Sequence, residues 1–205
     1  MSEEGIWADI ERARAKWNVL EHPFYQRWSA GELSRSDLAA YSGQYRHATK
    51  ALAQLSADAA ESAPEAERAQ LRGHADEEAA HVALWDGFVE AVGGDTEATP
   101  TPETRECVDA WAGEGDFASQ LVRLYAIESG QPAISQTKRA GLKAHYGIGE
   151  GTGSDYFRVH EKADVTHAAE ARELIERHAA DADPEALVGA AESAFAANWR
   201  LLDGV

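Results

Sequence analysis

The sequence predicts an all-α protein, a single domain over residues 1–205 whose roughly seven helices pack as a bundle. The chain has 205 residues, of which 44% are hydrophobic, enough to build one sizeable core. The six prolines are confined to a few points along the chain, where most of them mark helix starts or linkers. Apolar residues recur at helical spacing between these points, and strand patterns are nearly absent.

Seven segments carry this helical periodicity. They span about residues 5–20, 34–61, 64–92, 102–112, 116–146, 155–180 and 184–202. Ser34 is followed three residues later by Asp37, which approximates a capping box and predicts a helix start. Pro64 suits the first turn of the next helix, and Gly93-Gly94 predicts its end.

Breaks in the second half of the chain separate the remaining helices. Residues 99–102 alternate threonine and proline and predict a linker. Gly130 and Pro132 predict an interruption of the long 116–146 segment. The glycine-rich run over 147–154 predicts a loop before the next helix.

Composition excludes several classes of function. The formal net charge of -17, spread along the chain, argues against nucleic acid and anionic membranes as partners. A high-salt host and an ordinary acidic, alanine-rich bacterial protein both account for this charge. No apolar run has the length of a signal peptide or a bilayer span, so we expect a soluble, cytoplasmic protein. The single cysteine, Cys107, cannot form an internal disulfide or a thiolate zinc cluster.

A histidine–aspartate–histidine stripe is the strongest chemical pattern. His160, Asp164 and His167 are spaced i, i+4 and i+7, so their side chains point the same way from one helix. Two imidazoles and one carboxylate form the ligand set of non-haem iron sites. The alternative is an ordinary solvated polar face.

A second candidate pair lies in the 64–92 segment. Glu78 and His81 form a Glu-x-x-His pair, the spacing used in dimetal carboxylate bundles. Glu77 lies four residues before His81 and serves equally well at this level, and His74 lies two turns before His81 on the same side. The alternative is an acidic cluster beside one histidine at the core edge.

Glu128 is the third candidate, because it falls in a stretch that is otherwise apolar. A buried carboxylate is costly unless it is paired or bound to a cation. Pairing with Arg123 or Arg139 is the structural alternative. Together the three patterns supply three carboxylates and three imidazoles, which suits two metal ions with Glu128 as the bridging ligand. Oxygen and nitrogen ligands without thiolate favour iron or manganese.

These patterns and their flanking residues resemble the haem-oxygenase-like helical superfamily, which includes thiaminase II (TenA) and pyrroloquinoline-quinone synthase (PqqC). Within it, the branch of the chlamydial protein associating with death domains (CADD) is the most similar. The likeness is carried by His22–Trp28, Leu38–Tyr41, Tyr125–Pro132, Lys138–Leu142 and the stripe from His160 to His167. It covers roughly residues 17–180.

The resemblance implies a seven-helix haem-oxygenase-like (TenA/PqqC-like) fold that binds no haem, and a homodimer. It also implies two non-haem metal ions, ferrous iron foremost with manganese as the alternative, that activate O2. The ligands carried over are Glu77 or Glu78, His81, Glu128, His160, Asp164 and His167. The chain departs from the branch at His74, where the branch pattern has a glutamate, and the spacing before His81 is shorter.

In that branch the implied reaction is formation of 4-aminobenzoate, a folate precursor, from the protein's own tyrosine. Tyr25 matches the consumed tyrosine and Lys138 matches the proposed amino donor. Tyr41 and Tyr156 match tyrosines near the site. Ile127 stands where the branch has a tyrosine. The structural alternatives are a packing role for Tyr25 and a surface position for Lys138.

Other functions remain open at this stage. An oxidase of an external amino acid or fatty acid would use the same ligands. In either case an unidentified reductant would supply electrons. A TenA-type hydrolase requires an activated cysteine, and Cys107 lies away from the ligand-bearing segments. A non-enzymatic helical binding protein would not be expected to place several charged side chains in one core.

Overall fold

The computed structural model describes residues 3–113, 115–179 and 182–205, and within these residues every regular element is helical. The elements are α1 (Glu3–Lys16), the 3-10 turn η1 (Val19–Glu21), α2 (Pro23–Ala30), α3 (Arg35–Ser62), α4 (Glu65–Val92), α5 (Pro102–Trp111), α6 (Phe117–Glu128), α7 (Gln131–His145), α8 (Asp155–His178) and α9 (Pro184–Asp203). The all-α prediction is confirmed.

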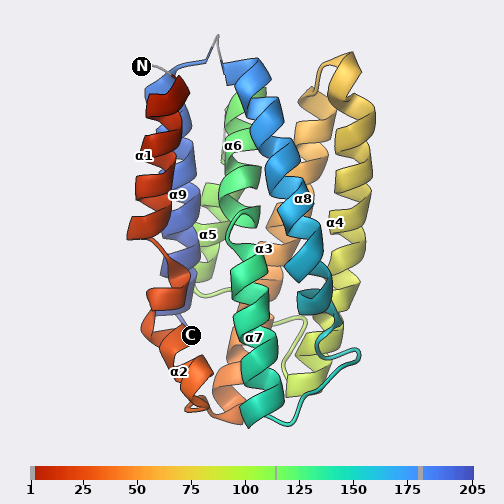
Figure 1. Ribbon diagram of the computed structural model, residues 1–205. Coiled ribbons are helices and arrows are strands. Elements are labelled where there is room, and N and C mark those ends of the chain that lie inside the picture. Colours follow the sequence, from red (N-terminus) through yellow and green to blue (C-terminus); the bar gives the residue numbers. More distant parts are fainter. Residues whose placement is uncertain (1–2, 114, 180–181) are drawn as a thin grey trace.

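The long helices lie side by side along the axis of the bundle (Figure 1). Helices α3 and α4 form an antiparallel pair, and α8 packs against α4, α6 and α7. On the opposite side, α9 contacts α1, α5 and α6. Helices α4, α6 and α8, which carry the candidate ligands, are therefore neighbours around the core.

The described residues contain nine α-helices rather than about seven, because α2 was not predicted and the predicted interruption near Gly130 and Pro132 divides one segment into two helices. Pro23 occupies the first turn of α2, and the ring nitrogen of His22 accepts a hydrogen bond from the Phe24 amide, which caps this helix. Gly31 ends α2 with a positive φ of 73°, a conformation that favours glycine. Pro132 lies in the first turn of α7, so the predicted 116–146 segment is two helices.

The predicted helix ends elsewhere agree with the structure. Ser34 and Asp37 form a complete capping box at the start of α3. Gly93 ends α4 in the left-handed conformation. No helix in the described part of the chain is both long and apolar enough to cross a bilayer.

A cluster of large aromatic side chains fills the lower half of the bundle. Trp28 and Trp85 are fully buried, and each indole nitrogen donates to a backbone carbonyl, that of Lys138 at 3.2 Å and that of Ser42 at 2.8 Å. These bonds remove the cost of burying the indole N–H groups. They also tie α2 to α7 and α4 to α3.

The contact between α2 and α7 depends on Gly141. A Cβ atom at this position would lie 2.6 Å from the Trp28 ring. We therefore expect Gly141→Ala to lower the free energy of unfolding by about 1–3 kcal/mol, although alanine is the better helix former. A Cβ atom at Gly189 in α9 would meet no heavy atom within 4 Å, so Gly189→Ala is the control, expected to be neutral or stabilising. Urea unfolding of both variants checks this; equal stabilities would contradict it.

Candidate metal centre

Seven ionisable side chains converge in the core between α4, α6 and α8. They are His74, Glu78 and His81 from α4, Glu128 from α6, and His160, Asp164 and His167 from α8. On α4 and on α8 the three residues are spaced i, i+4 and i+7, so each helix presents one stripe to the core. Glu78, Glu128, His160 and Asp164 are completely inaccessible to solvent.

The donor atoms form two groups that share one carboxylate. His74, Glu78, Glu128 and His167 each offer one atom within 4.8 Å of the others, and so do Glu78, His81 and His160. Glu78 belongs to both groups. The sequence alone favoured Glu128 as the shared ligand, whereas the geometry gives that position to Glu78.

Short contacts link imidazoles to carboxylates in both groups. His74 Nε2 lies 2.7 Å from Glu128 Oε1, and His81 Nδ1 lies 2.9 Å from Glu78 Oε1. Arg139, one of the two arginines considered as partners of Glu128, pairs with Glu161 instead. Glu128 faces an imidazole.

Several buried polar atoms in the cluster lack a hydrogen-bond partner among the residues that the structure describes. They include both carboxylate oxygens of Asp164, Nε2 of His160 and Nδ1 of His167. Buried polar atoms are normally satisfied, so each exception calls for an explanation. Cations bound between these atoms would satisfy them, and the donor set of imidazoles and carboxylates fits iron or manganese.

Burial and charge shift the pKa values of this cluster in opposite directions. Burial opposes ionisation of Glu78, but the imidazoles of His160 and His81 outweigh it and hold the pKa of Glu78 far below its ordinary range. Burial raises the pKa of Glu128, against the opposing effect of His74. Burial also lowers the pKa of His167, but the carboxylates of Asp164 and Glu128 outweigh it and raise that pKa to about 9. Imidazolium groups therefore supply positive charge among the buried carboxylates.

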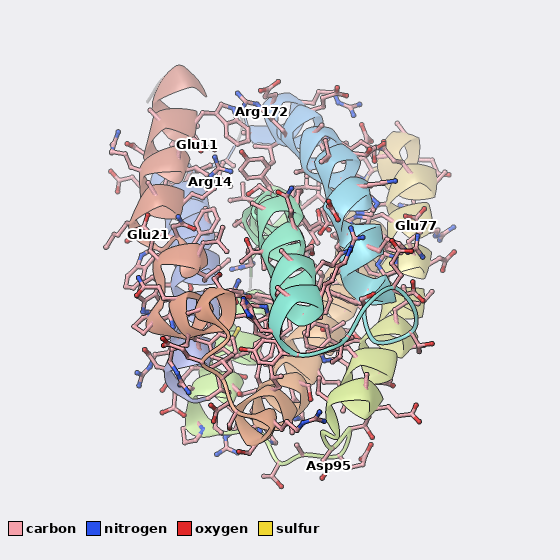
Figure 2. The ribbon with its side chains drawn as sticks, turned by 60° about the horizontal axis from the view of Figure 1, so that its bottom comes forward. Glu11, Arg14, Glu21, Glu77, Asp95 and Arg172 are labelled. Carbon is pink, nitrogen blue, oxygen red and sulfur yellow. The ribbon has the colours of Figure 1, made fainter. Side chains whose placement is uncertain are left out.

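Glu77 and Glu78 occupy different environments, which distinguishes the two candidates left open by the sequence. Glu78 is fully buried between the two groups, whereas the side chain of Glu77 is 60% exposed. Figure 2 shows Glu77 at the outside of the bundle, where α4 and α8 adjoin. Glu77 Oε2 lies 3.2 Å from Nε2 of His167, while Nδ1 of that ring faces Asp164 at 3.5 Å. Glu77 is thus an outer partner that orients His167.

Lys138 is buried in the aromatic cluster next to the centre, and it is not a surface residue. Its Nζ lies 4.6 Å from the ring centre of Tyr45, 5.3 Å from that of Tyr41 and 5.7 Å from that of Tyr25. The lysine is completely inaccessible, and burial lowers its pKa well below the ordinary value. Burial also raises the pKa values of Tyr25 and Tyr41, so both phenols keep their protons.

Two aromatic residues connect the two regions: Tyr156, which the resemblance had placed near the site, and Trp85, which the sequence had not assigned a role. Tyr156 stacks on His160 with ring centres 3.9 Å apart, and Trp85 lies 4.8 Å from Tyr156 and 4.9 Å from Tyr45. Trp85 lies four residues from His81, and Tyr156 lies four residues from His160, so each ring shares a helix face with a donor of the cluster. This spacing was the signal in the sequence for their place beside the centre. Cys107 lies in α5 outside both donor groups, and burial raises the pKa of its thiol, which disfavours a nucleophilic thiolate.

Comparison with known proteins agrees with this geometry. A family described as iron-containing redox enzymes matches residues 46–199. A Chlamydia trachomatis protein named 4-aminobenzoate synthase is 36% identical over 171 residues, which cover 78% of this chain and 74% of that protein. A Nitrosomonas europaea protein of the same name is 30% identical over 210 residues, covering 92% of this chain and 85% of that protein.

Solved structures support the predicted fold class. A TenA homologue from Pseudomonas syringae superposes with a TM-score of 0.81 at 19% identity, covering 98% of this chain and 90% of that chain. A domain of unknown function from Shewanella denitrificans, with a haem-oxygenase-like fold, gives a TM-score of 0.80 at 21% identity, covering 95% and 88%. The haem-oxygenase-like fold expected from the sequence is confirmed.

Separate substitutions of Glu77 and Glu78 test which of the two carboxylates is needed for metal binding. Glu78→Gln removes the carboxylate shared by both donor groups, so we expect loss of at least one bound metal ion per chain. Glu77→Gln keeps an oxygen that can accept from His167 and should retain the full metal content. Metal analysis of both variants after reconstitution with ferrous iron under anaerobic conditions gives the comparison. Equal metal contents would contradict the central position assigned to Glu78.

Protonation of His167 should also stabilise the metal-free protein. Its pKa in the folded state is raised to about 9 from an ordinary value of about 6.5. The stabilisation is therefore fully present below pH 6.5 and is lost as the pH rises through 9. Thermal unfolding in the presence of a chelator should show a Tm that falls across this range. In His167→Gln the fall should be smaller; an unchanged pH profile would refute the effect.

Proposed function

Because this chain belongs to the family of iron-containing redox enzymes, and is an oxidoreductase with the haem-oxygenase-like fold, we propose that it is a dimetal oxidase that forms 4-aminobenzoate from its own Tyr25. The observation that carries the proposal is the burial of Lys138 against Tyr25 beside a cluster of metal-binding side chains. Relatives that are at least 30% identical to this chain over the aligned residues are named 4-aminobenzoate synthase.

Two ions would be held by the two donor groups that share Glu78. His74, Glu128 and His167 would complete one site, and His81 and His160 the other, with Asp164 adjoining them. Ferrous iron suits this donor set, with manganese as an alternative in one of the sites. When bound, the ions activate O2 and supply the oxidising power of the reaction.

Lys138 would provide the amine nitrogen of the product. Because burial lowers its pKa well below the ordinary value, its Nζ is held as a neutral amine with an available lone pair. No hydrogen-bond partner among the described residues competes for this nitrogen. The surrounding rings exclude water and fix the amine near Tyr25 and Tyr41. After oxidation of the Tyr25 ring by O2, the amine would condense with the ring carbon that bears the phenol oxygen, and that oxygen would leave as water. Release of 4-aminobenzoate would then require cleavage of the Lys138 Cε–Nζ bond and of the Tyr25 Cα–Cβ bond, with O2 as the oxidant.

Tyr41 would act as a positioning residue for Tyr25. Both rings pack against Phe24, at centre-to-centre distances of 4.7 Å for Tyr41 and 5.5 Å for Tyr25. The hydroxyl of Tyr41 is buried and interacts with that of Tyr25. Burial raises the pKa of both phenols, and this contact adds to the rise for Tyr41 and opposes it for Tyr25. A neutral phenol in this position can pass a proton to or from its neighbours as charge develops during oxidation.

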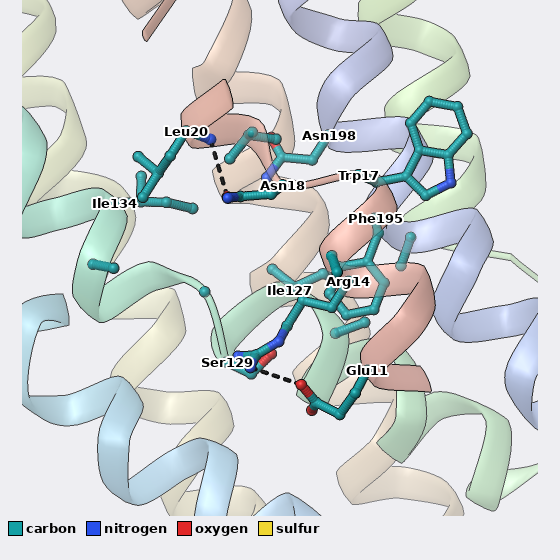
Figure 3. A pocket seen from close by; sticks show the side chains of 16 residues that line it. Glu11, Arg14, Trp17, Asn18, Leu20, Ile127, Ser129, Ile134, Phe195 and Asn198 are labelled. Carbon is teal, nitrogen blue, oxygen red and sulfur yellow. Dashed lines mark hydrogen bonds and ion pairs between the residues drawn. The ribbon is translucent and has the colours of Figure 1, made fainter. Parts of the chain in front are cut away.

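A cavity on the other side of α6 favours a second candidate function, oxidation of an external small molecule. This cavity of about 330 Å³ lies between α1, α9 and the junction of α6 with α7 (Figure 3). Its walls are largely apolar, and Asn18, Asn198 and the ion pair of Arg14 with Glu11 add polar groups. Ile127 and Ser129, the neighbours of Glu128 in sequence, line it. An amino acid or fatty acid with an apolar body and a carboxylate fits this lining.

The fate of residue 25 distinguishes the two functions. Protein loaded anaerobically with ferrous iron, with and without manganese, is exposed to O2 and a reductant, and its peptides are analysed by mass spectrometry. We expect loss of mass at Tyr25 and release of 4-aminobenzoate. Tyr25→Phe and Lys138→Met should each lower product yield at least tenfold while metal content stays unchanged, because neither residue belongs to the donor groups.

The opposite result identifies the alternative. If O2 is consumed while Tyr25 stays intact, self-sacrifice is excluded. Addition of amino acids or fatty acids should then stimulate O2 uptake, and substitution of Arg14, which lines the α1–α9 cavity, should weaken that stimulation.

A further inference from the structure

A groove on the surface between α4 and α8 leads to the donor cluster. Its volume is about 380 Å³. It is lined by Gln70, Gly73, His74 and Glu77 from α4 and by Ala163, Thr166, His167 and Glu170 from α8. Two of these residues, His74 and His167, also belong to one of the two groups of metal donors.

The two imidazoles form the floor of the groove and separate it from the buried carboxylates. Their ring centres are 4.2 Å apart, so the rings lie against each other. On the inner side, His74 contacts Glu128 at 2.7 Å and His167 contacts Asp164 at 3.5 Å. The side chain of His167 is only 8% exposed, so the ring shields the carboxylates behind it from solvent. The two imidazole rings therefore lie between the groove and the buried carboxylates.

The rim of the groove is acidic. Glu77 and Glu170 are carboxylates, and none of the eight lining residues that the structure describes is a lysine or arginine. The two other cavities of comparable size differ, since one includes Arg14 and the other includes Arg139 and Lys143. Carboxylates at the mouth of a cleft raise the local concentration of cations there. The α4–α8 groove thus combines negative charge at its mouth with metal-binding groups at its floor.

We propose that the α4–α8 groove is the path by which divalent metal ions reach the centre, and that Glu77 is a transient capture site on this path. The proposal rests on the dimetal function given above. Glu77 is exposed, so its carboxylate can bind a hydrated ion from solution. It also contacts His167 at 3.2 Å, so an ion held by Glu77 lies directly beside a ligand of the centre.

This position explains why an acidic residue precedes Glu78 without entering the centre. An ion bound by Glu77 neutralises the charge that attracts Nε2 of His167, which weakens that contact. The His167 ring is then free to turn away from His74 and open the floor. Once the ion has passed to the inner carboxylates, the contact between Glu77 and His167 forms again and closes the floor.

The rate of metal uptake tests this assignment independently of catalysis. Metal-free protein is mixed with Co(II) under anaerobic conditions in a stopped-flow instrument, and the visible absorption bands of the bound ion report loading. Glu77→Gln should slow the second-order uptake about 3- to 10-fold and Glu77→Lys more than 10-fold, because charge in a cleft changes association rates by such factors. The final number of bound ions should equal that of the unaltered protein. Raising the salt concentration to about 0.5 M should reduce the differences.

Glu90 provides the matched control. It is an exposed glutamate on the same helix, 13 residues from Glu77 and outside the groove lining. Glu90→Gln and Glu90→Lys change the net charge equally and should load at the rate of the unaltered protein. Unchanged uptake in both Glu77 variants, or equal slowing in the Glu90 variants, would overturn the groove as the path.

The same experiment separates this inference from the function on which it rests. Normal Co(II) binding by all proteins with equal rates refutes only the path. Failure of the unaltered protein to bind Co(II) at all refutes the dimetal centre and the path together. Slow uptake with a reduced final metal content in Glu77→Gln also overturns the proposal, since it would make Glu77 a permanent ligand.

Discussion

The burial of four ionised or ionisable groups with no access to solvent is the constraint on which the arrangement of α4, α6 and α8 depends. Glu78, Glu128, Asp164 and His160 lie in the middle of an otherwise apolar bundle. Such groups destabilise a core unless opposite charges meet them at short range. The three helices therefore need a register in which imidazoles from α4 and α8 face carboxylates from all three. Any shift of one helix turn would leave charges unpaired.

Burial has opposite outcomes for the charge of ionisable groups in two neighbouring regions of the same core. In the donor cluster, carboxylates and imidazoles lie close enough for charge to persist, and the pKa of Glu78 is held far down despite desolvation. In the aromatic cluster, Lys138 has only rings around its Nζ, and burial drives it toward the neutral form. Tyr156 belongs to both regions, because it stacks on His160 and contacts Trp85. A charged cluster of imidazoles and carboxylates and an amine shifted toward its neutral form thus lie next to each other in one small bundle.

The sequence predicted the fold class and most of the site, because helical spacing and caps are local properties. The i, i+4, i+7 stripe from His160 to His167 and the capping box at Ser34 appear in the structure as expected. The spacing to His81 left both Glu77 and Glu78 as candidates, and only their burial in the structure separates them. The burial of Lys138 was not predictable, because the rings that enclose it come from α2, α3, α4 and α8, and only tertiary packing brings them together.

The interruption between α6 and α7 has a consequence for the field at the centre. It makes Glu128 the last residue of α6, so this carboxylate lies at the helix end where the last backbone carbonyls lack intrahelical partners. The aligned peptide dipoles place roughly half a negative charge at a helix C-terminus. An uninterrupted helix over 116–146 would have satisfied those carbonyls internally. The break near Gly130 and Pro132 therefore gives the backbone at the end of α6 a share in attracting cations, beside that of the Glu128 carboxylate.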